Sequence, residues 1–146
     1  MKVMVNILAF AMLFFASCTK EEPDMPTPAS VKTMQLSIGN KIFTATLEDN
    51  SSAESFYALL PTTLEMNELN GNEKYNYLET TLPVNSIRPG TINAGDIMLY
   101  GENCIVVFYE TFKSSYSYSP IGHINDIQQL KEALGTGNIT IKFSKQ

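Results

Sequence analysis

The sequence predicts a mainly β domain, a closed antiparallel β-barrel with two short α-helices that cap its open ends. Many short segments have the composition of strands, and only two have helical spacing. The chain has 146 residues, 44% hydrophobic and 17% charged, which suits one globular domain. An all-β domain of this size must hide its sheet edges, and closing the sheet into a barrel does so.

The predicted strands are short runs of β-branched, aromatic or alternating residues bounded by Gly, Pro and Asn. They cover residues 34–38, 42–47, 62–66, 97–100, 104–109, 121–124 and 139–143. The strongest hairpin signal joins 97–100 to 104–109 through Gly101-Glu102-Asn103. Residues 75–78 are predicted as a strand or an ordered loop, and residues 83–93, rich in Pro and Gly, as a loop.

Two segments carry the helical spacing of apolar residues, 51–60 and 126–134. Ser51 and Glu54 are spaced as a capping box at the start of the first helix. Asn125 is the predicted N-cap of the second. A Pro follows the first segment and a Gly follows the second, so both helices are expected to end there.

Residues 1–17 have the pattern of a secretory signal peptide, because Lys2 precedes an unbroken apolar run over 7–16. That run is shorter than the roughly 20 apolar residues of a membrane-spanning helix. Its end, Phe15-Ala16-Ser17-Cys18, resembles the lipobox of bacterial lipoproteins, which implies that Cys18 is lipidated and becomes the mature N-terminus. The alternatives are an ordinary secreted protein cut nearby and an uncleaved anchor.

Residues 18–31 are polar and hold three prolines, which predicts an extended linker before a domain over 32–146. Within the linker, Lys20-Glu21-Glu22 resembles a signal that sends lipoproteins to the cell surface in Bacteroidetes-type bacteria, although a solvated linker fits equally well. We therefore expect a bacterial cell-envelope location, held at a membrane through an N-terminal lipid and exposed at the surface if that signal operates.

Composition excludes several function classes. The formal net charge is −5, which argues against a nucleic-acid partner, since such a partner requires a basic face. One His and two Cys cannot build a four-ligand zinc site of the usual His/Cys kind, so no metal site is expected. Phosphate loops and dinucleotide fingerprints are absent from the sequence, so no cofactor is expected either.

Individual candidates for catalysis are weak. Cys104 lies in an apolar run and is predicted to be a small buried hydrophobic residue rather than a nucleophile. His123, the single histidine, is predicted to be structural, with Asp126 as its pairing or capping neighbour. A triad of Ser115, His123 and Asp126 is disfavoured, because no nucleophile-elbow pattern surrounds any of them.

The aromatic residues point more clearly to a function. Tyrosine has a flat apolar face and a polar tip, so it suits wet binding grooves. Residues 114–119 alternate Ser with Tyr, so both tyrosines face one side if the segment is extended. The predicted ligand-binding residues are Tyr75, Tyr77, Tyr100, Phe112, Tyr116 and Tyr118. The alternative is that several are half-buried barrel tyrosines.

Three stretches carry a family resemblance. Leu-Asn-Gly-Asn-Glu-Lys-Tyr over 69–75, the Pro-Gly-Thr-Ile stretch that runs through 89–101, and Ser-Tyr-Ser-Tyr over 115–118 are similar to bacterial cyclophilin-like domains. The order of strands and helices also resembles the cyclophilin fold, and the resemblance covers nearly all of 32–146. It implies a cyclophilin-like barrel. The family has no settled biochemical function and sometimes occurs beside flavodoxin-like domains.

True cyclophilins isomerise prolyl bonds with a catalytic arginine in a Phe-His-Arg type of motif. The matching region here, about 62–78, contains neither Arg nor His, and the only arginine, Arg88, is predicted to be a solvated loop residue. We therefore expect a non-catalytic binding module for a peptide or a small ligand. The alternatives are a divergent peptidyl-prolyl cis-trans isomerase and a purely structural envelope protein.

Overall fold

Ten strands and two helices occupy residues 30–146, the part of the chain that the computed structural model describes. In chain order they are β1 (Thr33–Ile38), β2 (Lys41–Leu47), α1 (Ser51–Ala58), β3 (Thr62–Leu69), β4 (Glu73–Tyr77), β5 (Thr91–Ile92), β6 (Asp96–Tyr100), β7 (Cys104–Phe108), β8 (Phe112–Lys113), β9 (Ser119–Ile124), α2 (Leu130–Leu134) and β10 (Ile139–Lys145). Neither helix is long and apolar enough to cross a membrane.

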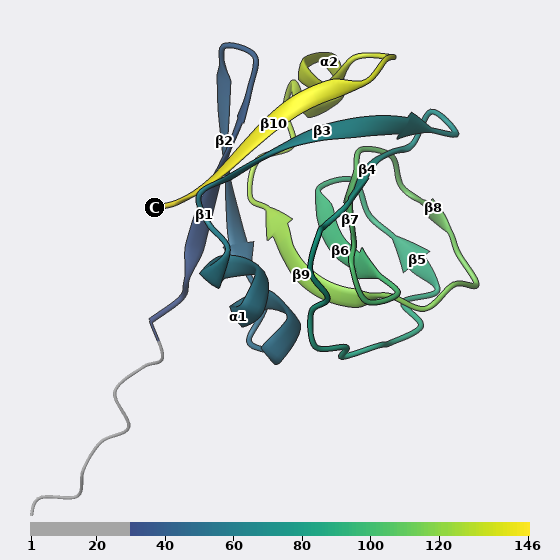
Figure 1. Cartoon of the computed structure of the whole chain (residues 1–146). Helices are drawn as coiled ribbons and strands as arrows, with labels where there is room; N and C mark the ends of the chain where they lie inside the picture. Colours follow the sequence, from purple (N-terminus) through teal and green to yellow (C-terminus); the bar gives the residue numbers. More distant parts are fainter. Residues whose placement is uncertain (1–29) are drawn as a thin grey trace, which may run out of the picture.

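The barrel closes through antiparallel pairs in the order β1-β10-β3-β4-β7-β6-β9-β2 (Figure 1). This confirms the predicted architecture, a mainly β closed antiparallel barrel with two short helices. Within this ring, β4 and β7 lie opposite β1 and β2. A substitution on one of these sides can therefore serve as a control variant, distant from the site, in experiments that test the other side.

Alternation along the strands builds the barrel core. On β1, Met34, Leu36 and Ile38 are buried, while the residues between them are partly exposed. The two helices lie at opposite ends of the barrel (Figure 1), and each contributes apolar side chains to the same core. Phe56 of α1, for example, packs edge-to-face on Phe143 of β10, with ring centroids 5.5 Å apart.

The N-cap of helix α1 lies one residue before the predicted cap. Asn50 is the N-cap, and its side-chain oxygen accepts a hydrogen bond from the Ala53 backbone N–H at 2.9 Å. Ser51, the predicted cap, instead donates its hydroxyl to Asn85 Oδ1 at 2.7 Å. The capping-box prediction was wrong because Asn50 offers an equally good acceptor one position earlier and also bonds the Pro120 carbonyl.

Helix α2 is much shorter than the predicted helix over 126–134. Gln129 has a left-handed backbone, with φ of 64°, and this interrupts a continuous helix before Leu130. Asp126 accepts the Gln128 N–H in an Asx turn, a local alternative to helix. Asn125 does not cap the helix, because its side-chain oxygen accepts the Thr46 hydroxyl at 2.8 Å.

Two segments leave the barrel surface and lie side by side as one arm. We call residues 84–95 and 110–118 the outer arm; it carries the small β5-β8 sheet and the Ile87–Tyr118 bridge. The prediction of loop over 83–93 therefore missed β5, a two-residue strand too short to leave a pattern. In Figure 1 the outer arm lies on the side of the barrel away from β1 and β2.

Candidate functional site

The outward face of β4, β7 and β6 forms the floor of the candidate site. Glu73, Tyr75 and Tyr77 occupy alternate positions of β4, so they share this face. The antiparallel register sets Tyr77 beside Cys104 of β7, and Cys104 beside Tyr100 of β6. Strand β4 and the β6-β7 hairpin, which are distant from each other in sequence, thus present one polar and aromatic surface.

The outer arm covers part of this surface and buries a second apolar cluster, separate from the barrel core. The cluster contains Ile92, Met98, Cys104, Val106, Phe108 and Tyr118, with Tyr75 and Phe112 packed against it. Every residue of β7 is buried, because the barrel core covers one face of the strand and this cluster covers the other. Burial on both faces explains why the sequence of β7 is apolar without alternation.

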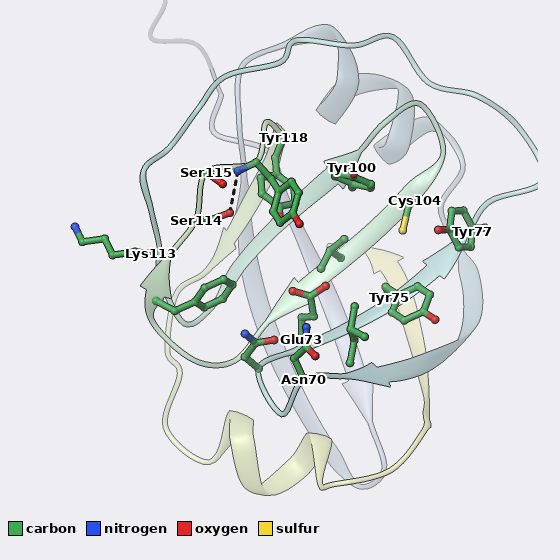
Figure 2. A pocket seen from close by; sticks show the side chains of 15 residues that line it. Asn70, Glu73, Tyr75, Tyr77, Tyr100, Cys104, Lys113, Ser114, Ser115 and Tyr118 are labelled. Carbon is green, nitrogen blue, oxygen red and sulfur yellow. Dashed lines mark hydrogen bonds between the residues drawn. The ribbon is translucent and has the colours of Figure 1, made fainter.

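Beside this cluster lies a cavity of about 440 Å³ (Figure 2). Its lining includes all six residues predicted to bind a ligand: Tyr75, Tyr77, Tyr100, Phe112, Tyr116 and Tyr118. They come from β4, β6, β8 and the end of the outer arm. The volume is within the range of small-molecule sites in proteins.

The aromatic residues form two walls. On β4, the rings of Tyr75 and Tyr77 are 5.9 Å apart and edge-to-face. On the other side, the ring centroid of Tyr100 lies 6.1 Å from that of Tyr116 and 5.7 Å from that of Tyr118. Residues 114–118 do not form the regular strand that the alternation required, so Tyr118 is 6% exposed and Tyr116 is 61% exposed. Both tyrosines nevertheless contact Tyr100.

A carboxylate, Glu73, lies between these walls (Figure 2). Burial raises its pKa, and the negative charge of Glu68 raises it further. No ion pair within residues 30–146 involves Glu73. Lys113, the other charged residue of the lining, points away from it in Figure 2 and donates to Thr91 Oγ1 at 2.6 Å. The cavity therefore holds a half-buried acidic group without a cation.

Sequence analysis did not single out Glu73. The signal was present, because Glu73 precedes Tyr75 and Tyr77 at the spacing of two that places strand residues on one face. A prediction that places Tyr75 and Tyr77 of one strand in a ligand site therefore implies that Glu73 lies in the same site.

Asn72 and Cys104 also line the cavity. The side-chain oxygen of Asn72 is inaccessible to solvent and has no hydrogen-bond partner in the described part of the chain. Burial raises the pKa of the Cys104 thiol to about 11, with a contribution from the charge of Glu73. The thiol is therefore protonated at neutral pH, and Cys104 is buried as predicted.

Behind the floor, the inward side of β4 carries a fully buried lysine that sequence analysis missed. The Lys74 ammonium pairs with the Glu68 carboxylate and donates to the backbone oxygens of Gly135 at 2.9 Å and Gly137 at 2.6 Å. The Tyr109 hydroxyl also donates to Glu68, at 2.8 Å. Burial acts to raise the pKa of Glu68, but hydrogen bonds led by that from Lys74 outweigh it and lower the pKa below its usual value.

The residues that were considered for catalysis are divided between the cavity and other parts of the surface. Cys104 and Ser115 line the cavity, whereas Arg88, His123 and Asp126 do not. His123 pairs with Asp96, Nδ1 to Oδ1 at 2.9 Å, and not with the predicted neighbour Asp126. In residues 30–146 no group of three His, Cys, Asp or Glu residues is arranged to hold a metal ion.

Comparison with known families agrees with this architecture. The model of the Cyclophilin-like family matches residues 36–144, from within β1 to within β10, and so covers nearly all of the barrel domain. The chain belongs to the Cyclophilin-like family. A search of curated proteins finds no match to it. As a cyclophilin-like domain it carries its cavity outside the barrel, between β4 and the outer arm.

Proposed function

We propose that this protein is a cell-envelope lipoprotein whose cyclophilin-like domain is a non-catalytic binding module for a peptide or a small ligand. The observation that carries the binding role is the convergence of six predicted aromatic residues on one cavity of about 440 Å³. Aromatic walls with a few convergent polar groups are the usual composition of a ligand site.

The chemistry of the cavity supports binding over catalysis. A prolyl isomerase polarises the amide with a positioned arginine, and the only arginine of the sequence, Arg88, is exposed and outside the cavity lining. Cys104 lines the cavity, but its raised pKa of about 11 keeps the thiol protonated and weakly nucleophilic. Neither group is set up to act on a bound molecule.

A screen of a small-molecule and peptide library on the full-length protein tests the binding role. Tyr116→Ala should weaken the binding of any ligand found, since Tyr116 lines the cavity. The substitution should spare the core, because Tyr116 is largely exposed. Tyr57→Ala on α1 is the control, because it removes a tyrosine outside the cavity lining. Since Tyr57 packs against the barrel core, circular dichroism verifies that this variant is folded before binding is compared. Binding that Tyr116→Ala leaves unchanged would contradict the assignment of the cavity.

A protease-free isomerisation assay tests the non-catalytic part of the proposal. We expect no rate above the uncatalysed one. Prolyl isomerase activity that Arg88→Ala abolishes would overturn the proposal in favour of a divergent isomerase.

The lipid anchor is supported by the sequence of residues 1–31, most of which lie outside the described residues. A signal peptide over 1–17, lipidation of Cys18 and a tether over 18–31 would hold the domain, predicted over 32–146, at the envelope. Cys18→Ser should abolish incorporation of labelled lipid and release the protein from membranes. Incorporation that persists in Cys18→Ser would rule out this site.

A further inference from the structure

The cavity combines a carboxylate with facing aromatic rings. Glu73 shares the outward face of β4 with Tyr75 and Tyr77, and Tyr100 and Tyr118 lie across the cavity from that strand (Figure 2). Tyr116 also lines the cavity, beside Tyr100. The faces of aromatic rings attract cations, and this attraction grows when the cation is taken out of water. Rings around an acidic group are therefore suited to a positively charged ligand.

The charge of Glu73 is left uncompensated by the described part of the protein. Lys113 is bound to Thr91, and Lys74 projects to the opposite side of β4, where it pairs with Glu68. A half-buried carboxylate costs free energy unless a cation or hydrogen-bond donors face it. Its raised pKa records that cost. A ligand cation would supply the missing partner.

We infer that this cavity binds an organic ammonium group, with Glu73 as its counter-ion and the tyrosine rings as its walls. The inference rests on the proposed binding function and narrows its ligand class. The tyrosine hydroxyls add acceptors for N–H or O–H groups elsewhere on the same ligand.

A matched pair of probes isolates the charge. Choline and 3,3-dimethyl-1-butanol have nearly the same shape, but only choline carries a cationic nitrogen. Titrations of the full-length protein, followed by NMR of the tyrosine ring protons, should give a dissociation constant for choline about tenfold lower than for the neutral alcohol. A third probe, the Nα-acetyl amide of trimethyl-lysine, presents the same head group on a peptide unit.

Two variants test the two parts of the site. Glu73→Gln keeps the shape of the side chain and should bring the two dissociation constants within about twofold of each other. Glu48→Gln makes the same change in net charge after β2, on the opposite side of the barrel, and should retain the preference for choline. Tyr116→Leu keeps an apolar wall without a ring, so it should weaken the binding of choline several-fold and leave the binding of the neutral alcohol unchanged.

The outcomes separate this inference from the proposed function. A preference for choline that Glu73→Gln abolishes supports the ammonium site. Tighter binding of the trimethyl-lysine probe than of choline assigns the ammonium group to a peptide rather than to a free amine. Equal or tighter binding of the neutral alcohol overturns the ammonium site but leaves a binding cavity. Failure of all three probes to shift the tyrosine resonances also overturns it, and the library screen then decides the proposed function. If Glu73→Gln does not fold, selective weakening of choline by Tyr116→Leu supports the ammonium site, and an unchanged preference overturns it.

Discussion

Replacing Lys74 by Met tests whether the buried ion pair behind the cavity holds the barrel together at this point. Lys74 is 0% exposed, and its ammonium donates to the Glu68 carboxylate and to the backbone oxygens of Gly135 and Gly137. Methionine fills nearly the same volume but removes the ammonium donor from all three acceptors. The loss is therefore electrostatic rather than a cavity effect.

The magnitude follows from what each acceptor keeps. Removing one partner of a buried pair costs about 3–5 kcal/mol. Glu68 retains the Tyr109 hydroxyl and the Gly71 N–H as donors and is partly exposed, so its share is reduced, whereas the two glycine oxygens each lose a charged donor. We expect Lys74→Met to lower the free energy of unfolding by about 3 kcal/mol and the melting temperature by roughly 10–15 °C.

Urea denaturation of the full-length protein at pH 7 measures the effect. Lys142→Met is the control, since Lys142 is an exposed lysine of β10 and should change the free energy of unfolding by less than about 0.5 kcal/mol. A loss below about 1 kcal/mol in Lys74→Met would refute the reasoning, because the buried donors would then contribute no more than surface ones.

The pH dependence of stability gives an independent measure of the same pair. The pKa of Glu68 is lowered in the folded state, so its contribution is fully present above the unfolded pKa of about 4.5 and is lost as pH falls through the folded pKa. Glu68→Gln should therefore flatten the acid limb of a plot of melting temperature against pH. An unchanged acid limb would show that other carboxylates dominate it.

Local contacts lead to three further predictions. Asn50→Ala should destabilise the protein by about 1–2 kcal/mol in thermal unfolding, because Asn50 is the N-cap of α1, and Ser51→Ala should destabilise it by clearly less. A larger loss in Ser51→Ala than in Asn50→Ala would show that Ser51 caps the helix, as the capping box predicts. Gly122→Ala should cost about 2 kcal/mol or more, because its Cβ would lie 2.5 Å from the Thr46 backbone oxygen, and a neutral effect on urea midpoints would contradict that contact. In a Cys18→Ser background, Cys104 should react with iodoacetamide at pH 8 about 100-fold more slowly than in the unfolded chain, given its pKa of about 11; comparable rates would mean the thiol is accessible and ionised.

Alternation along strands made the barrel and the aromatic part of the cavity predictable. Residues of β1 and β2 alternate or are β-branched, and the turn at Gly39-Asn40 leaves one way to pair them. The tyrosines were predicted together because of their chemistry. Their convergence depends on the register of β4, β7 and β6. Predicting where each strand lies along the sequence does not predict that register.

What sequence reasoning missed depends on tertiary partners. Lys74 has the pattern of an exposed strand residue, and only the carbonyls of the loop after α2 and the acid on β3 make its burial possible. Gln129 has the propensity of an ordinary helix former, but its left-handed backbone shortens α2. Similarly, Asn50 competes with Ser51 as N-cap because Pro120 of β9 lies within its reach.

The outer arm leads to a consequence for how this architecture can vary. It contributes no strand to the closed ring, and the cavity it borders lies outside the barrel core, with β7 as the wall between them. Changes in the length or the side chains of the arm can therefore reshape the cavity while every backbone pairing of the ring is kept. One barrel can thus be combined with many different cavities, which makes the arm the natural place to redesign the cavity.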